Sequence, residues 1–89
     1  MTKKNCLALM NKELRNALRT YHALSDISQE ELAARMQITP RACSGLENGE
    51  YGFSIFSTMA LFSILSPEDR FRLFAKLCAI MAQMLGEAA

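Results

Sequence analysis

The stretch ISQEELAARMQITPRACSGLENG, residues 27–49, decides the fold because it reads as two short helices joined by a tight turn. Ser28 precedes the first helix, and Glu31 follows it at the spacing of a capping box. Thr39-Pro40 opens the second helix, since threonine caps a helix and proline fits its first position. Gly49 can close it in the left-handed conformation. The two predicted helices cover residues 29–36 and 40–48.

Apolar residues at helical spacing extend this pattern to the rest of the chain. Leu7 is expected to face inward from the first helix, and Ile55 and Met59 from the fourth. Ser66-Pro67 is a strong start signal for a fifth helix, which we expect to stop at Gly86. Because no strand-like alternation appears, the sequence predicts an all-α bundle. Its five helices are expected over residues 5–23, 29–36, 40–48, 55–64 and 67–85.

Composition narrows the class of protein. The chain has 89 residues, a size typical of one domain, and a net charge of +1. Its longest apolar run, residues 77–82, is far shorter than the roughly 20 residues of a membrane span. The N-terminus does not lead into a signal-peptide core. We therefore expect a cytoplasmic protein that does not enter a membrane.

Catalytic and metal-binding signals are missing from the sequence. Cys6, Cys43 and Cys78 are widely spaced and odd in number, which suits three unpaired thiols. No cysteine or histidine cluster indicates a metal, and no cofactor motif appears. One histidine, no nucleophile elbow and no glycine-rich phosphate loop argue against an enzyme.

Charge is distributed unevenly along the chain. Residues 1–25 carry five basic residues and one acidic residue, whereas residues 26–52 carry two basic and five acidic residues. Affinity for DNA comes largely from phosphate neutralisation. The acidic second segment therefore weighs against strong DNA binding by a single copy, unless the basic first segment lies beside the DNA backbone.

Two motifs resemble the helix-turn-helix of the phage repressor and Cro family. They are Ser-Gln-x-x-Leu-Ala, starting at Ser28, and Ile-Thr-x-x-x-x-Ser-x-Leu-Glu-Asn-Gly, starting at Ile38, and the resemblance covers residues 14–65. It implies a repressor-like helix-turn-helix formed by the second and third helices, with the third in the DNA major groove. Two departures stand out. Gln37 replaces the usual turn glycine, and Gly45 occupies a position where a longer side chain would give one more contact to DNA.

The resemblance implies a set of contacts to double-stranded DNA. Arg41, in the first turn of the third helix, suits the O6 and N7 atoms of guanine, the alternative being a solvated arginine. Asn48 suits a phosphate or a helix C-cap, and Thr39 is first a cap. Tyr51 either offers its hydroxyl to a phosphate or covers the core. The full expected set is Gln29, Thr39, Pro40, Arg41, Ser44, Asn48 and Tyr51.

The resemblance also implies a structural pair. His22 falls where the family commonly has an arginine that pairs with the glutamate corresponding to Glu47. A histidine keeps a donor there but makes the charge depend on pH. The alternative is a solvent-facing histidine at the end of the first helix.

The fifth helix is apolar over most of its girth, so it must be covered on more than one side. One stripe can pack on its own domain, and the other is expected to bind a second copy. We therefore expect one domain over residues 1–89, with a repressor-like core (1–65) and a C-terminal association helix (66–86). The expected dimer interface consists of Phe71, Phe74, Leu77, Cys78, Met81, Met84 and Leu85.

These expectations describe a transcriptional regulator that binds specific DNA as a homodimer and acts, for example, as a repressor. The alternative is a protein-interaction adaptor or antitoxin-like module, which uses the same fold to bind a protein partner without reading DNA. The acidic segment, Gly45 and the apolar fifth helix favour this alternative.

Overall fold

The computed structural model describes residues 1–88 and the side chains of residues 1–86, so Ala89 lies outside the described residues. It confirms the predicted all-α fold, since the described part of the chain contains helices and no strand. The helices are α1 (Lys3–Ser25), α2 (Gln29–Met36), α3 (Pro40–Asn48), α4 (Ile55–Ile64) and α5 (Pro67–Ala88).

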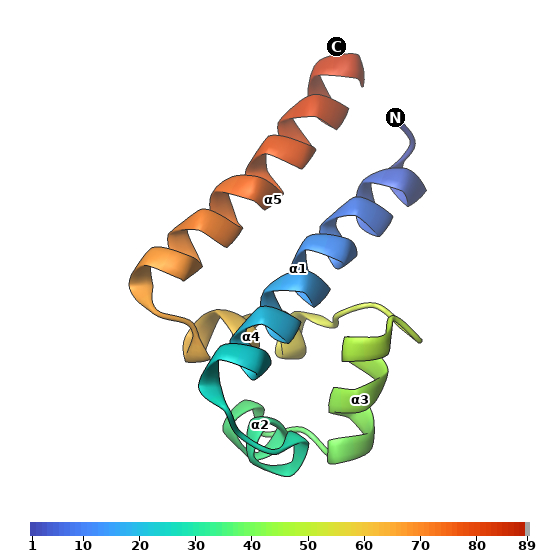
Figure 1. Ribbon diagram of the computed structural model, residues 1–89. Coiled ribbons are helices and arrows are strands. Elements are labelled where there is room, and N and C mark those ends of the chain that lie inside the picture. The colour runs from blue at the N-terminus through green and yellow to red at the C-terminus, as the bar shows by residue number, and fades with distance from the viewer. Residues whose placement is uncertain (89) are drawn as a thin grey trace.

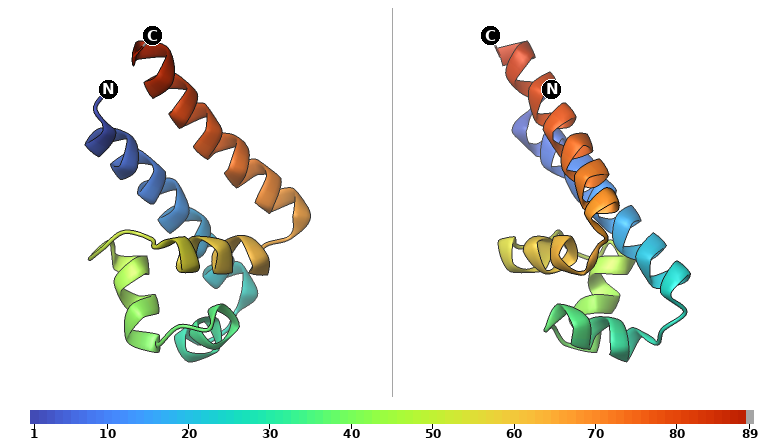
Figure 2. Two further views of the ribbon diagram at one scale, coloured as in Figure 1. Left: turned by 180° about the vertical axis from the view of Figure 1, so that it is seen from behind. Right: turned by 90° about the vertical axis from the view of Figure 1, so that its left-hand side faces the viewer.

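The molecule has two regions, which we call the head and the arm. The head (residues 14–65) contains α2, α3, α4 and the second half of α1. The arm (residues 3–13 and 67–86) consists of the first half of α1 and most of α5, which run side by side toward the end that holds both termini (Figures 1 and 2). The whole is elongated, with extents of 44 × 27 × 19 Å.

Side-chain caps set the helix starts. The Ser28 hydroxyl accepts a hydrogen bond from the Glu31 N–H at 3.1 Å. The Thr39 hydroxyl accepts one from the Ala42 N–H at 3.0 Å. These bonds satisfy donors that a helix leaves unpaired in its first turn. A full capping box forms at α4, where Ser54 and Ser57 each bond to the other's backbone N–H.

Two helices are longer than predicted. α1 gains two residues at each end and closes at Asp26, which adopts the left-handed conformation. α5 continues to Ala88, so the predicted stop at Gly86 is wrong. A glycine ends a helix when its φ is positive, and Gly86 keeps helical backbone in open space.

The core joins residues from all five helices. Leu18, Leu32, Met36 and Leu61 are fully buried, and Leu73 brings α5 into the same cluster. A buried leucine of this kind contributes roughly 1.5–3 kcal/mol by leaving water. All five helices therefore contribute to a common core.

The inward faces of two helices differ from the prediction. In α1, Leu7 is half exposed and Cys6 is buried instead. In α4, Ile55 is 85% exposed and Met59 58% exposed, and the buried residues are Ser57 and Leu61. Because the α4 sequence IFSTMALFSI is apolar on nearly every side, its periodicity does not choose a face.

Arg70 fixes the corner between α4 and α5. Its Nε donates to the Phe62 carbonyl at 2.8 Å, and its Nη2 donates to the Leu65 carbonyl at 3.2 Å. These carbonyls belong to the last turn and the C-cap of α4, where acceptors have no partner within the helix. The guanidinium thus ties the end of the head to the start of the arm.

Within the described residues, no helix combines the length and the apolar character that crossing a membrane requires.

Candidate nucleic-acid interface

The turn between α2 and α3 has the geometry expected of a helix-turn-helix, although it lacks glycine. Gln37 takes the left-handed conformation, with φ of 59°. Its N–H donates to the Ala34 carbonyl at 3.1 Å, and the Ile38 N–H donates to the Ala33 carbonyl at 3.0 Å. A left-handed residue with a Cβ costs about 1–2 kcal/mol. The chain tolerates this strain because the turn satisfies the end of α2.

α3 presents one polar face to solvent. Cys43 and Leu46 point into the core, with 0% and 4% exposure. Arg41 and Asn48 are exposed on the opposite side, with Ser44 half-buried between them. The Asn48 amide donates to the Ser44 hydroxyl at 3.2 Å, which links two of the predicted DNA contacts. Thr39 and the exposed Pro40 lie at the start of the same helix.

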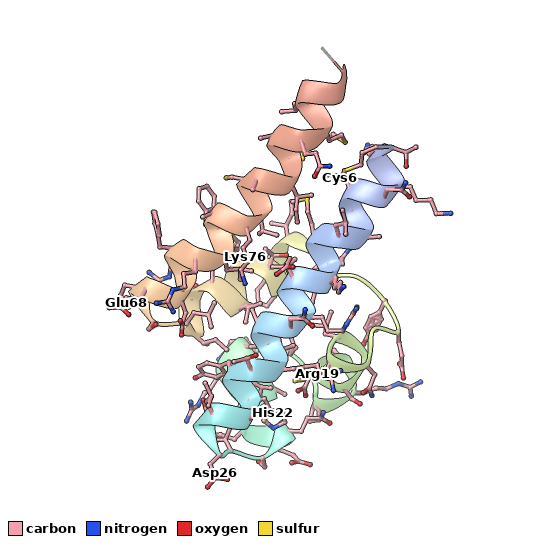
Figure 3. All side chains as sticks on the ribbon, turned by 45° about the horizontal axis from the view of Figure 1, so that its top comes forward. Cys6, Arg19, His22, Asp26, Glu68 and Lys76 are labelled. Carbon is pink, nitrogen blue, oxygen red and sulfur yellow. The ribbon has the colours of Figure 1, made fainter. Side chains whose placement is uncertain are left out.

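The half-buried carboxylate of Glu47 joins α1, α2 and α3. Glu47 Oε2 lies 2.7 Å from His22 Nδ1, and Glu47 Oε1 accepts a hydrogen bond from Gln29 Nε2 at 3.0 Å. The Glu47 side chain is only 12% exposed. His22 lies at the end of α1 that is next to these helices (Figure 3). The structure therefore brings together Gln29, His22 and Glu47, and it uses one Gln29 donor inside the protein.

His22 faces an acceptor from each ring nitrogen. Nδ1 lies against the Glu47 carboxylate, and Nε2 lies 3.0 Å from the Ile27 carbonyl. A neutral imidazole has one N–H, so both hydrogen bonds require the protonated ring. The hydrogen bond with Glu47 raises the pKa of His22 most, burial opposes it, and the Glu47 charge and the Ile27 carbonyl raise it further.

Cys43 is a core residue beside the same carboxylate. Its Sγ lies 3.9 Å from Glu47 Oε1. Burial, followed by the negative charge of Glu47, raises the pKa of the thiol to about 11. The thiol is therefore neutral at ordinary pH and suits packing, since reactivity needs the thiolate.

Gly45 lies on the exposed side of α3 but is covered by Tyr51. A Cβ built at Gly45 would be 2.3 Å from Tyr51 Cζ. The Tyr51 hydroxyl donates to the Ala42 carbonyl at 3.1 Å. Gly45 itself supplies no side chain for DNA, as the sequence indicated, and the Tyr51 ring occupies the space beside it.

The excess of acidic residues in residues 26–52 overstates the negative charge on the solvent-facing side of α3. Glu47 points toward α1, where it contacts His22, and Glu31 Oε1 contacts Arg35 Nε at 3.3 Å. Arg15 of α1 lies against the C-terminal end of α3, since a Cβ built at Gly49 would be 3.0 Å from its Nη1. A cation is favourable beside the negative end of a helix.

Asn11 is a positioning residue that the sequence did not reveal. Its Oδ1 accepts a hydrogen bond from the Phe53 N–H at 2.8 Å, which anchors the loop after α3 to α1. The partners are 42 residues apart, so no local pattern connects them. Only the contact between α1 and this loop shows the role of Asn11.

A second surface covers the outer sides of α4 and α5. Phe71 is 73% exposed, and Phe74, which packs edge-to-face on Phe62 at 6.5 Å between ring centroids, is 58% exposed. A shallow apolar groove joins the two helices. The groove is lined by Met59, Phe62, Pro67, Arg70, Phe71 and Phe74. Helical spacing extends the same faces to the exposed Ile55, Cys78 and Leu85, and we call all these residues the α4–α5 surface.

The expected dimer residues divide between this surface and the interior. Leu77 is only 8% exposed and packs in the core of its own chain, so its assignment to the dimer interface is wrong. Met81 and Met84 are half-buried. Met81 Sδ lies 3.6 Å from Cys6 Sγ, a van der Waals packing distance between the two halves of the arm. The α5 residues left for a partner are Phe71, Phe74, Cys78 and Leu85.

Comparison with known families agrees with this geometry. Residues 13–56 match the sequence model of a helix-turn-helix family. No curated protein and no solved structure matches the chain. The matched segment contains α2, the left-handed turn and α3. The chain therefore contains a DNA-binding helix-turn-helix domain of the repressor and Cro type, and the predicted resemblance is confirmed.

Proposed function

We propose that the protein is a transcriptional regulator that binds specific operator DNA as a homodimer. The observation that carries the proposal is the solvent-facing side of α3, where Arg41, Ser44 and Asn48 lie on a helix held at a fixed angle by Glu47. The N-terminal turn of such a helix enters the major groove. Arg41 reads guanine there through its two parallel donors.

The remaining predicted contacts serve affinity more than sequence reading. Asn48 and the unused polar atoms of Gln29 contact the DNA backbone, as do Thr39 and Pro40 at the start of α3. The regulator acts in the cytoplasm by occupying its site, which blocks or recruits polymerase.

The α4–α5 surface supports the homodimer. Ile55 is 85% exposed and Phe71 is 73% exposed. Exposing such large apolar side chains to water is unfavourable, and a patch of them marks a binding surface. A two-fold pair of copies covers the same surface on each partner. In such a dimer we expect the two α3 helices to enter successive major grooves, about 34 Å apart. A second copy is thus the partner that the DNA-binding mode requires.

The DNA-binding proposal is tested by selecting bound sequences from a random duplex pool and by measuring affinity at several salt concentrations. We expect a two-fold motif and a steep loss of affinity with salt. Weak binding that does not change with salt contradicts the proposal and favours the adaptor function.

Arg41→Ala sharpens this test. We expect it to weaken binding to the selected site by about 1–3 kcal/mol and to relax preference at one base pair in each half-site. Arg35→Ala is a matched control, because Arg35 lies on α2 and contacts Tyr21 and Glu31. An equal loss on all sequences would make Arg41 a phosphate contact.

The homodimer is tested by light scattering of the free protein across micromolar concentrations. We expect the mass of two chains. The reaction of the exposed Cys78 with a thiol reagent should also slow as concentration rises, because Cys78 lies in the α4–α5 surface. A single-chain mass with a constant rate of reaction argues against this interface.

A further inference from the structure

Helical periodicity places four residues on the outward face of α3. Cys43 and Leu46 point inward, so positions 41, 44, 45 and 48 point outward. Position 45 lies one turn after Arg41 and directly beside it on that face. It carries glycine, so α3 itself supplies no side chain there.

Gly45 is nevertheless buried. The atoms nearest to a Cβ built on it are Cζ, Oη and Cε1 of Tyr51, at 2.3, 2.4 and 2.7 Å. These distances are too short for any side chain, so the end of the phenol ring lies against the bare backbone of the helix. Tyr51 remains 46% exposed, and its outer side therefore continues the surface of α3.

The hydroxyl of Tyr51 is directed back at the helix. It donates to the Ala42 carbonyl at 3.1 Å, and the Arg41 carbonyl lies 3.5 Å away. Its single proton is therefore engaged, and it is not a free donor for a phosphate. What Tyr51 offers outward is the apolar face of its ring.

We propose that Tyr51 is a specificity-determining residue that supplies, from the loop after α3, the base contact that position 45 lacks. The partner of its ring is the C5-methyl group of a thymine next to the base pair that Arg41 reads. Apolar groups recognise thymine through this methyl group in the major groove. The inference rests on the proposed DNA-binding function, and it makes Gly45 and Tyr51 one unit.

The first experiment removes the methyl group from the DNA. Once the selection has given a motif, each thymine is replaced in turn by deoxyuridine, which differs only at C5. At one position in each half-site, the unaltered protein should lose roughly threefold to tenfold in affinity. Tyr51→Leu should bind the thymine and deoxyuridine sites equally, because the shorter leucine side chain does not extend to the position of the ring over Gly45. Tyr51→Phe keeps the ring and should retain most of the discrimination.

The second experiment displaces the ring without changing Tyr51. In Gly45→Ala, the new methyl group expels the ring, which is the free end of a flexible side chain. Alanine also favours helix, so the protein should remain folded. We expect the same loss of discrimination as in Tyr51→Leu, and no further loss in the double variant. Gly86→Ala is the matched control, since nothing lies within 4 Å of its Cβ.

NMR gives a readout that needs no DNA. The Gly45 α-protons should show a ring-current shift that disappears in Tyr51→Leu. If the unaltered protein binds duplex DNA but Tyr51→Leu keeps its thymine preference, this inference is overturned and the proposed function stands. If no duplex is bound at all, the proposed function fails and the inference fails with it.

Discussion

The helices of the head are joined by a polar network in addition to their apolar core, whereas in the arm the helices meet mainly through apolar atoms. Glu47 connects three helices of the head through contacts of 2.7 and 3.0 Å. In the arm, Leu73 and Leu77 pack on α1, and Cys6 Sγ lies against Met81 Sδ. An ion pair between Lys76 and Glu13 spans 3.8 Å at the arm surface.

The difference shows how one small chain divides two tasks. Hydrogen bonds have preferred directions, so the network around Glu47 fixes the angle of the reading helix. Apolar contact is not directional, so α5 can bury one side on α1 and keep the other for a second copy. The predictions below test this division, from the largest expected effect to the smallest.

Removing a leucine from the core of the head should have the largest effect on stability. Leu32 of α2 is fully buried, so Leu32→Ala should lower the free energy of unfolding by about 2–5 kcal/mol. Leu24→Ala is the control, because Leu24 is 81% exposed. Urea denaturation measures both. Equal stabilities would mean that the head core is not the main source of stability.

Placing a charge on the arm should separate the two copies without unfolding either. Phe71→Glu should weaken the dimer by about 2 kcal/mol and change the stability of the single chain by less than about 0.5 kcal/mol. Analytical ultracentrifugation and urea denaturation of the same sample distinguish the two effects. Leu24→Glu puts the same charge at an exposed leucine outside the α4–α5 surface and should leave the dimer intact.

The contact between His22 and Glu47 should make the stability of the head depend on pH. The folded pKa of His22 lies above its unfolded value of about 6.5. Protonation therefore stabilises the folded state. This contribution is complete below the unfolded pKa and is lost as pH rises through the folded pKa. We expect a loss of under about 1 kcal/mol, measured by thermal unfolding across this window.

His22→Gln should flatten that dependence, because glutamine does not titrate. The Ile27 carbonyl adds to the expected effect, because a neutral His22 ring has one N–H and can donate to only one of its two acceptors, Glu47 and the Ile27 carbonyl. An NMR titration that places the His22 pKa below its unfolded value would show that burial outweighs the carboxylate.

The turn offers the smallest change. Gln37→Gly should stabilise the head by about 0.5 kcal/mol. Glycine removes the strain of the left-handed conformation, but it also loses more backbone entropy on folding, which offsets part of that gain. Asp26→Gly relieves the second left-handed residue, at the end of α1, and provides a comparison. Destabilisation by Gln37→Gly would mean that the glutamine side chain supports the turn.

Helix positions were predictable because their signals are local. Ser28, Thr39 and Ser66 each accept a hydrogen bond from the residue three places later, as their sequence spacing indicates. The buried face of α4 was not predictable, because a helix that is apolar on nearly all sides has no periodic signal. Contacts with helices that are distant in the sequence decide which face of α4 is buried.

The candidate site was predictable only in part. The motif placed Arg41 and Asn48 on α3, and these positions follow from helical periodicity. The position of the Tyr51 ring over Gly45 depends on the path of the loop after α3. Asn11 of α1, which is distant in the sequence, anchors this loop. No local pattern reports such a contact. A missing side chain therefore looked like a lost contact, although the loop fills the space.

The corner at Arg70 has a geometric consequence for the operator. Its guanidinium clamps the last carbonyls of α4, so head and arm meet at a set angle. In the proposed dimer the α4–α5 surface joins the copies, and α3 of each head reads the DNA. A small change in the angle at this corner would therefore move the two α3 helices by a larger distance. If the proposed dimer forms, the angle that Arg70 helps to hold would contribute to the number of base pairs between the two half-sites.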